Sequence, residues 1–227
     1  MKIKLLRKSF YAVGLITILL TPCFAQQTQT PEEIAYTKTI TQRSEKIVKA
    51  LSLTDSMKAS RVQAIVVQQY RNLNAIHTAS DEQIKKIKSD TVQAKDKKEL
   101  AIKSLEEETM VKLDKVHKEY IAALSSELTV EQIDQVKDGM TYGVLPITYK
   151  GYQDMIPQLT AEQKAQILAY LIEARDHAMD AGSSDKKHWW FGKYKGRINN
   201  YLSAQGYNMK QESENWEKRR KAAGEKL

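Results

Sequence analysis

The sequence predicts an all-α protein: a helical bundle with a long N-terminal helical hairpin, and a C-terminal half of shorter helices that contains one long aromatic, glycine-rich loop. Apolar residues recur every three to four positions over most of the chain, as they do on one face of an amphipathic helix. Helix-capping motifs interrupt this pattern where one helix is expected to end and the next to begin. The 227 residues include only 4 prolines and 9 glycines, so few positions disfavour a helix.

The first 25 residues have the layout of a cleavable signal peptide. Four cations open the chain, an apolar run covers 11–20, and the sequence Thr-Pro-Cys-Phe-Ala leads to a cleavage site after Ala25. The apolar run is too short to span a bilayer. We therefore expect an exported protein, periplasmic or secreted, with no transmembrane helix after cleavage. Lipoprotein anchoring through Cys23 is the less favoured alternative, because a proline directly precedes the cysteine.

Cleavage leaves residues 26–227, for which we expect a single all-helical domain. It removes the only cysteine, so this domain has neither a disulfide nor a thiolate site. It also removes four cations and no anion, which reduces the net charge from +8 to +4. This mild basic bias suits anionic partners such as acidic glycans, and export disfavours nucleic acid. No cofactor is expected.

The N-terminal helices are predicted from their caps and their apolar stripes. A first helix is expected from Thr30 to about Leu51, because a threonine, a proline and a capping-box glutamate open it. An apolar stripe with helical spacing then begins after Thr54. A second long helix, about 91–126, is expected to fold back on it, with the charged segment 81–98 fraying or forming the turn.

The C-terminal half has shorter elements. A helix that begins at Thr129 is expected to end near Gly139, which suits a C-cap. Residues 140–158 combine glycines, two prolines and three tyrosines without a helical period, and they form the predicted loop. A short strand at 144–149 is the alternative. Three further helices are expected: after Thr160 to about Met179, from Ser184 to Gly206, and from about Asn208 to Ala223.

The helix from Ser184 has two different faces on a helical wheel. One face is apolar and is expected to pack in the core; it carries Phe191, Tyr194, Ile198, Tyr201 and Leu202. The other places Trp189 beside Gly192 and Gly196. Either the two glycines form a groove in which a second helix packs, or they leave an open surface that a ligand approaches.

The open-surface alternative predicts a sugar site. A tryptophan can stack on the apolar face of a sugar ring, while Lys193, Arg197 and Asn200 donate hydrogen bonds to its hydroxyl groups. Nine of the fourteen aromatic residues after Ala25 lie in two segments, 142–152 and 187–209. If the two segments meet, three tyrosines would wall the same site: Tyr142, Tyr149 and Tyr152.

Three strings resemble a known family: "DGMTYGVLPITYKGYQDMIPQLTAEQKAQI", "EARDHAMDAGSS" and "HWWFGKYKGRINNYLSAQGYNM". They are similar to the exported bacterial domain-of-unknown-function family number 3826, which is described as sugar-binding. The resemblance covers nearly all of the chain after the signal and is densest over 139–216. It implies an all-helical exported protein associated with polysaccharide use, and it supplies no catalytic residues to transfer.

Two other functions remain open from the sequence. A glycan-processing hydrolase or lyase is one, with Asp176 and His188 as its candidate residues, because acidic and histidine side chains cluster next to the tryptophans. The chain has no nucleophile motif and no recognisable metal-ligand spacing, so no metal site is expected. A periplasmic interaction or chaperone-like protein is the other, because two Leu-Thr-x-x-Gln motifs resemble those of small helical-hairpin chaperones.

Overall fold

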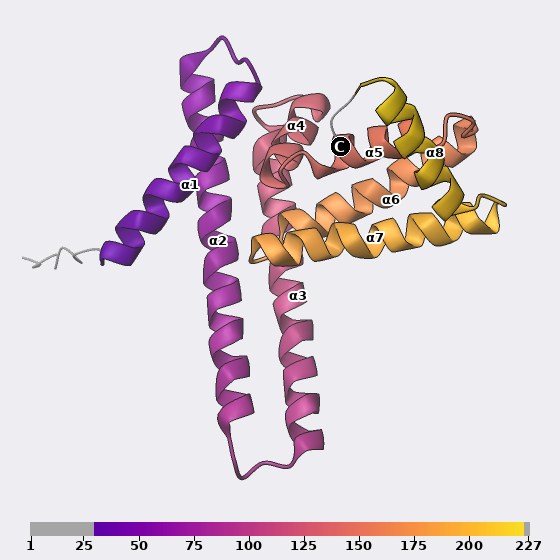
Figure 1. Ribbon diagram of the computed structural model, residues 1–227. Helices are drawn as coiled ribbons and strands as arrows, with labels where there is room; N and C mark the ends of the chain where they lie inside the picture. The colour runs from indigo at the N-terminus through magenta and orange to yellow at the C-terminus, as the bar shows by residue number, and fades with distance from the viewer. Residues whose placement is uncertain (1–29, 225–227) are drawn as a thin grey trace, which may run out of the picture.

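The computed structural model describes residues 30–224, and over this range it consists of eight α-helices without any strand (Figure 1). The predicted all-α fold class is confirmed. The predicted signal peptide, including Cys23, lies outside the described residues. Among the helices of the described range, none is long and apolar enough to cross a membrane.

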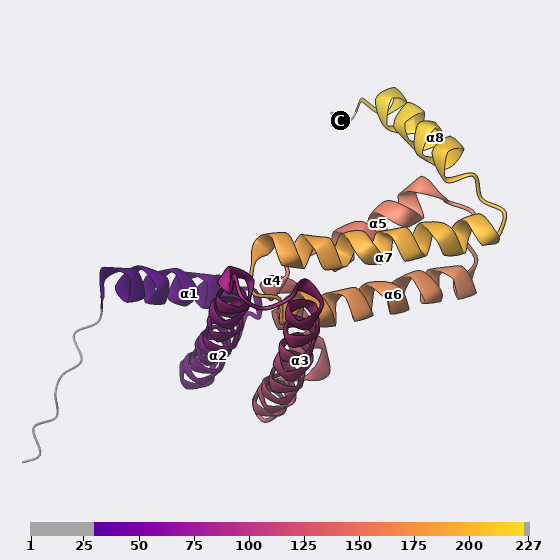
Figure 2. The same ribbon diagram turned by 90° about the horizontal axis from the view of Figure 1, so that it is seen from below.

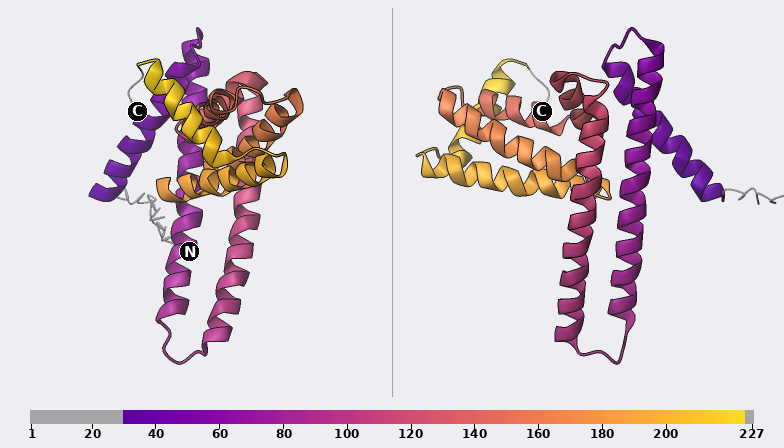
Figure 3. Two further views of the ribbon diagram at one scale, coloured as in Figure 1. Left: turned by 45° about the vertical axis from the view of Figure 1, so that its right-hand side comes forward. Right: turned by 180° about the vertical axis from the view of Figure 1, so that it is seen from behind.

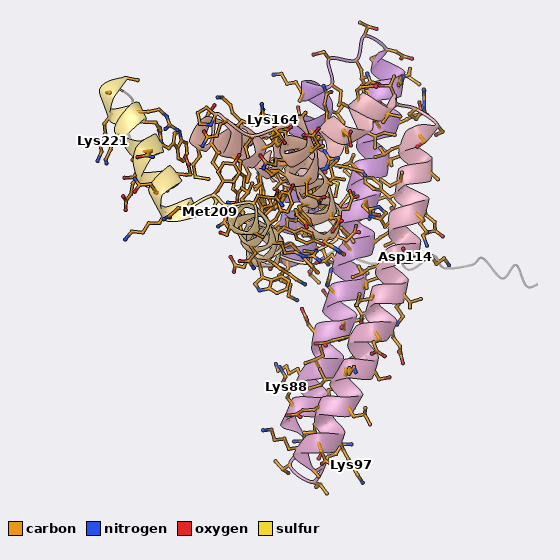
Figure 4. All side chains as sticks on the ribbon, turned by 90° about the vertical axis from the view of Figure 1, so that its right-hand side faces the viewer. Lys88, Lys97, Asp114, Lys164, Met209 and Lys221 are labelled. Atoms are coloured by element: carbon orange, nitrogen blue, oxygen red, sulfur yellow. The ribbon has the colours of Figure 1, made fainter. Side chains whose placement is uncertain are left out.

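The predicted hairpin consists of α2 (Ser56–Ser89) and α3 (Lys95–Ser125). Its far end projects beyond the other helices, as the positions of Lys88 and Lys97 show (Figure 4). At the opposite end, α1 (Pro31–Ala50) packs on α2 and on α4. Seen from below, α1 and the later helices extend to opposite sides of the hairpin (Figure 2).

The fourth helix ends within one residue of the predicted position, but the predicted C-cap role of Gly139 is wrong. Thr129 caps α4 (Val130–Met140) with the predicted capping box, but Gly139 lies inside the helix and does not end it. A Cβ atom on Gly139 would lie 2.8 Å from Cγ1 of Ile47 on α1. Real Cβ atoms do not approach other atoms so closely, so the glycine allows α1 and α4 to pack together.

The predicted loop at 140–158 is also wrong, because most of it is helix α5 (Val144–Met155), and the strand alternative is wrong for the same reason. The connection from α4 is short because Tyr142 and Gly143 both adopt a positive φ, 60° and 66°. Pro146 lies in the first turn of α5, where a missing N–H removes no helical hydrogen bond. Proline and glycine therefore do not interrupt this helix.

The last three helices agree with the prediction: α6 (Ala161–Met179), α7 (Ser184–Ala204) and α8 (Met209–Ala222). α6 and α7 lie side by side and meet the hairpin at one end of their length. α8 packs on α5 and α7 (Figure 3). None of its own residues is buried.

Two hydrophobic clusters form the core: the first consists mainly of residues of α1–α4 together with Met179 of α6, and the second mainly of residues of α5–α7. The expected core face of α7 lies in the second cluster, where Tyr201 is half-buried and the other four residues are buried. Arg175 of α6 joins the two parts, because its guanidinium donates to the carboxylates of Asp134 and Asp138 on α4. Met179 at the end of α6 is fully buried within the first cluster. These contacts hold the α6–α7 turn against the hairpin.

Candidate functional site

A cavity of about 550 Å³ lies where the α6–α7 turn meets the hairpin. This is a volume typical of small-molecule sites. Asp114 of α3, labelled in Figure 4, lies on its wall. The complete lining comes from four helices and the turn: His77 of α2; Met110, Leu113, Asp114 and His117 of α3; Asp176, His177, Asp180 and Ala181 at the end of α6; and Lys186, Trp189 and Trp190 of α7.

Trp189 and Trp190 form an aromatic wall with a bend in it. Their ring centroids lie 4.9 Å apart and their planes meet at 76°. Trp189 is 59% exposed, whereas Trp190 is half-buried and stacks on the imidazole of His177 at 4.2 Å. The Nζ atom of Lys193 lies 5.3 Å from the first indole ring and 4.8 Å from the second. The wall therefore offers the exposed indole of Trp189, and the ammonium group of Lys193 lies over both rings.

A histidine–aspartate pair lies in the same cavity. Nδ1 of His117 donates to Oδ2 of Asp180 at 2.7 Å, so Nε2 is the ring nitrogen that remains for a ligand. The hydrogen bond to this carboxylate raises the pKa of His117. The other carboxylate oxygen, Oδ1, is buried and accepts no hydrogen bond from the described residues. Asp180 therefore fixes both the tautomer and the orientation of the imidazole.

His77 ties α2 to the same turn. Its Nε2 donates to the backbone carbonyl of Asp180 at 2.7 Å, so one residue receives hydrogen bonds from both hairpin helices. A Cβ atom on Gly182 would lie 2.7 Å from Cγ of His77. Only glycine permits this approach, so the turn is held closely against the imidazole ring.

The remaining carboxylates of the cavity are paired with lysines. Asp176 accepts from Nζ of Lys137 on α4 at 3.0 Å, and Asp114 accepts from Lys118 at 2.6 Å. Each of these two carboxylates is therefore already engaged by a lysine of the protein. In the part of the chain that the structure describes, no group of three or more candidate ligands has a geometry that could hold a metal ion.

Lys187 is a buried lysine at the start of α7. Its Nζ donates to the carbonyls of Ala178 and Met179 at 3.0 and 3.1 Å. These carbonyls belong to the last turn of α6, where the helix leaves such groups without a helical partner. Burial lowers the pKa of Lys187 to about 8. Lys187 thus caps the C-terminal end of α6, which carries several of the residues that line the cavity.

Of the predicted donors on α7, Lys193 lies beside the cavity and the other two lie farther along the helix. Arg197 pairs with Glu173 at 3.4 Å and stacks on Tyr194, with 5.0 Å from its guanidinium carbon to the ring centroid. Asn200 is exposed one turn of helix beyond Arg197 from the tryptophans.

The two aromatic segments do meet, but the three tyrosines do not wall the cavity. Tyr142 stacks on His188 at 5.9 Å and shares a 2.6 Å hydrogen bond with Ser184. Tyr152 is buried and donates to Oδ1 of Asn199 at 2.8 Å. Tyr149 is partly buried against the second core cluster. All three join α7 to the neighbouring helices or to the core.

The face that carries Gly192 and Gly196 is open. A Cβ atom built on either glycine would meet no atom of residues 30–224 within 4 Å. Among the described residues no second helix packs into a groove at these glycines, so that alternative is wrong. Of the two residues proposed for an enzyme, Asp176 lines the cavity, whereas His188 lies outside it against Tyr142.

The sequence did not identify the histidines of the hairpin as site residues. His77 and His117 lie in helical patterns where a surface or core-edge histidine is usual, and 103 and 63 residues separate them from Asp180. Only the return of α6 to the hairpin brings them together. The positions of His77 and His117 in the sequence did not indicate that they would lie close to Asp180.

Comparison with known families agrees with the resemblance noted in the sequence. Residues 37–222 match the family described as protein of unknown function, DUF3826. The chain belongs to this family. The DUF3826 match includes every residue that lines the cavity. A search of curated proteins finds no match to the chain.

Proposed function

We propose that this chain is an exported protein that binds carbohydrate in the cavity between the hairpin and the α6–α7 turn. The observation that supports the proposal is the bent wall of Trp189 and Trp190 beside hydrogen-bonding side chains. A sugar ring has an apolar C–H face and a polar hydroxyl edge, and it matches a site with a flat aromatic surface and a polar rim.

The polar rim has both donors and acceptors. His117 presents a ring nitrogen to the cavity, and the lining also contains the carboxylates of Asp176 and Asp114. Lys186 belongs to the lining, and its pair with Asp81 is long, at 3.7 Å, and exposed on both sides. An exposed ion pair of this kind contributes little to stability, so the ammonium group of Lys186 is available to a ligand.

The open glycine face also supports the proposal. Gly192 and Gly196 each cost helix stability relative to alanine, about 1 kcal/mol per residue. With no packed helix in contact with them, the absence of side chains leaves the approach to Trp189 and Lys193 unobstructed. A long glycan can therefore extend from the cavity along α7.

A second concave surface serves as the internal comparison. It is an open groove between α5 and α8, with Ile147 and Trp216 among its lining residues. Arg219 also lines it, but its guanidinium already donates to two backbone carbonyls at 2.9 Å. The groove thus has one tryptophan, where the cavity has two together with the His117–Asp180 pair.

The test is calorimetry of the protein from residue 26 onward against a panel of neutral and acidic oligosaccharides. Removal of either cavity indole, by Trp189→Ala or Trp190→Ala, is expected to weaken binding about tenfold, a change of about 1.4 kcal/mol. Trp216→Ala is the matched control and is expected to bind as the unmodified protein does.

Two results would overturn the proposal. No heat with any member of the panel would remove carbohydrate binding. A loss of affinity in Trp216→Ala, with both cavity variants unchanged, would move the site to the groove between α5 and α8.

A further inference from the structure

We propose that the cavity is also catalytic: His117 acts as the base in a β-elimination that cleaves a uronic-acid glycan, and Asp180 positions it. This inference rests on the proposed carbohydrate site and adds a reaction and a substrate class to it. It makes the protein a polysaccharide lyase for acidic glycans.

The side chains of the cavity favour elimination over hydrolysis. Glycoside hydrolysis generally requires two carboxyl groups, one of which is protonated to act as an acid. Here Asp180 is hydrogen-bonded to His117, and Asp176 is paired with Lys137 at 3.0 Å. Both carboxyl groups are thus engaged by protein partners and are not presented as a free pair to a glycosidic bond. The imidazole of His117 is the group in the pair that gains and loses a proton near neutral pH.

The cations near the cavity fit an acidic sugar. Lys186 lines the cavity with only a long, exposed partner, and Lys193 lies over both indole rings. A sugar stacked on the tryptophans would place a carboxylate within reach of these ammonium groups. Neutralising that carboxylate makes the adjacent C–H bond more acidic, which is what a β-elimination requires.

The reaction balances without a co-reactant. Nε2 of His117 takes the proton from C5 of the uronate, and the electron pair of that C–H bond forms a double bond between C5 and C4. The bond between C4 and the glycosidic oxygen breaks, and this oxygen takes the proton back from the imidazolium. The products are an unsaturated uronate and a shortened chain, with no water, oxidant or metal consumed.

The test is the ultraviolet absorbance of the conjugated unsaturated uronate during incubation with polygalacturonate, alginate and hyaluronan. Product is expected from at least one of them and from none after chemical reduction of their carboxyl groups. His117→Gln is expected to reduce the rate at least a hundredfold, a loss much larger than its effect on oligosaccharide affinity measured by calorimetry. His188→Gln, which replaces a histidine outside the cavity, is the matched control and is expected to react normally.

Asp180→Asn tests the positioning role through the pH profile of kcat/KM. Loss of the carboxylate lowers the pKa of His117, so the acidic limb of the profile is expected to move to lower pH while the plateau falls. The other titratable groups around the imidazole remain in place: Asp176, Lys137, His77, Asp114 and His177. An unmoved limb would contradict this role.

The outcomes separate this inference from carbohydrate binding. Binding of acidic oligosaccharides without any unsaturated product overturns the elimination and leaves the binding proposal standing. Neither binding nor product overturns both. Product formation that survives in His117→Gln assigns the base to another residue and overturns the inference.

Discussion

The buried ammonium of Lys187 makes stability depend on pH in a defined direction. Burial lowers its pKa from 10.5 to about 8. Between these values the unfolded chain still holds the proton that the folded chain has lost, so the free energy of unfolding rises with pH. From about pH 8 to about pH 10 the rise is about 2 kcal/mol by this linkage.

Lys187→Met removes the titrating group and isolates this effect. The difference in unfolding free energy between the unmodified protein and the variant is expected to grow by about 2 kcal/mol over that interval. The assay is urea unfolding followed by circular dichroism, at several pH values in one ionic strength. Measurements stop near pH 10 because burial raises the pKa of Tyr70 and of Tyr152 to about 12. Above pH 10 the unfolded chain loses tyrosine protons first, and stability falls.

A constant difference across this range would refute the reasoning. It would mean that the ammonium of Lys187 is as well solvated as in the unfolded chain. The two hydrogen bonds to the end of α6 would then not be buried as the structure places them.

Two further predictions concern the contacts that position the cavity. Arg175→Ala is expected to destabilise the protein by about 3 kcal/mol in urea unfolding, because it removes a buried guanidinium and its hydrogen bonds to two partly exposed carboxylates. The exposed ion pair between Arg197 and Glu173 is the control, and Arg197→Ala is expected to lower the unfolding free energy by less than about 1 kcal/mol. Equal losses of stability in the two arginine variants would contradict the prediction. Gly139→Ala is expected to cost about 1–3 kcal/mol by overpacking against Ile47. The double variant Gly139→Ala/Ile47→Ala is expected to lose less unfolding free energy than the two single variants lose together. Strict additivity of the two losses would argue against the contact between Gly139 and Ile47.

Helix starts could be predicted from the sequence because capping is local. Thr30, Thr129 and Thr160 each accept from a backbone N–H three residues later, and the glutamate or glutamine at that position completes the capping box. The mechanism involves only four residues, all visible in the sequence. Asp55, and not the preceding threonine, caps α2, and Ser183 caps α7 one residue before the serine that was expected to do so.

The errors arose where the role of a residue depends on its neighbours in space. Pro146 suggested a loop, yet it occupies a helical turn that tolerates proline. Gly139 resembled a helix end, yet it serves the approach of α1. Trp189 and Lys193 were identified from the helical wheel of α7 alone. The His117–Asp180 pair could not be identified from the sequence, because α4, α5 and α6 lie between the two residues in the chain.

The central claim is that carbohydrate occupies the cavity between the hairpin and the α6–α7 turn, and a crystal structure with a bound oligosaccharide tests it most directly. The ligand is the panel member that gives the largest heat in calorimetry. The account predicts a sugar ring stacked on Trp189 or Trp190, with its polar edge toward His117. Electron density for the sugar in the groove beside Trp216, with the cavity empty, would contradict it.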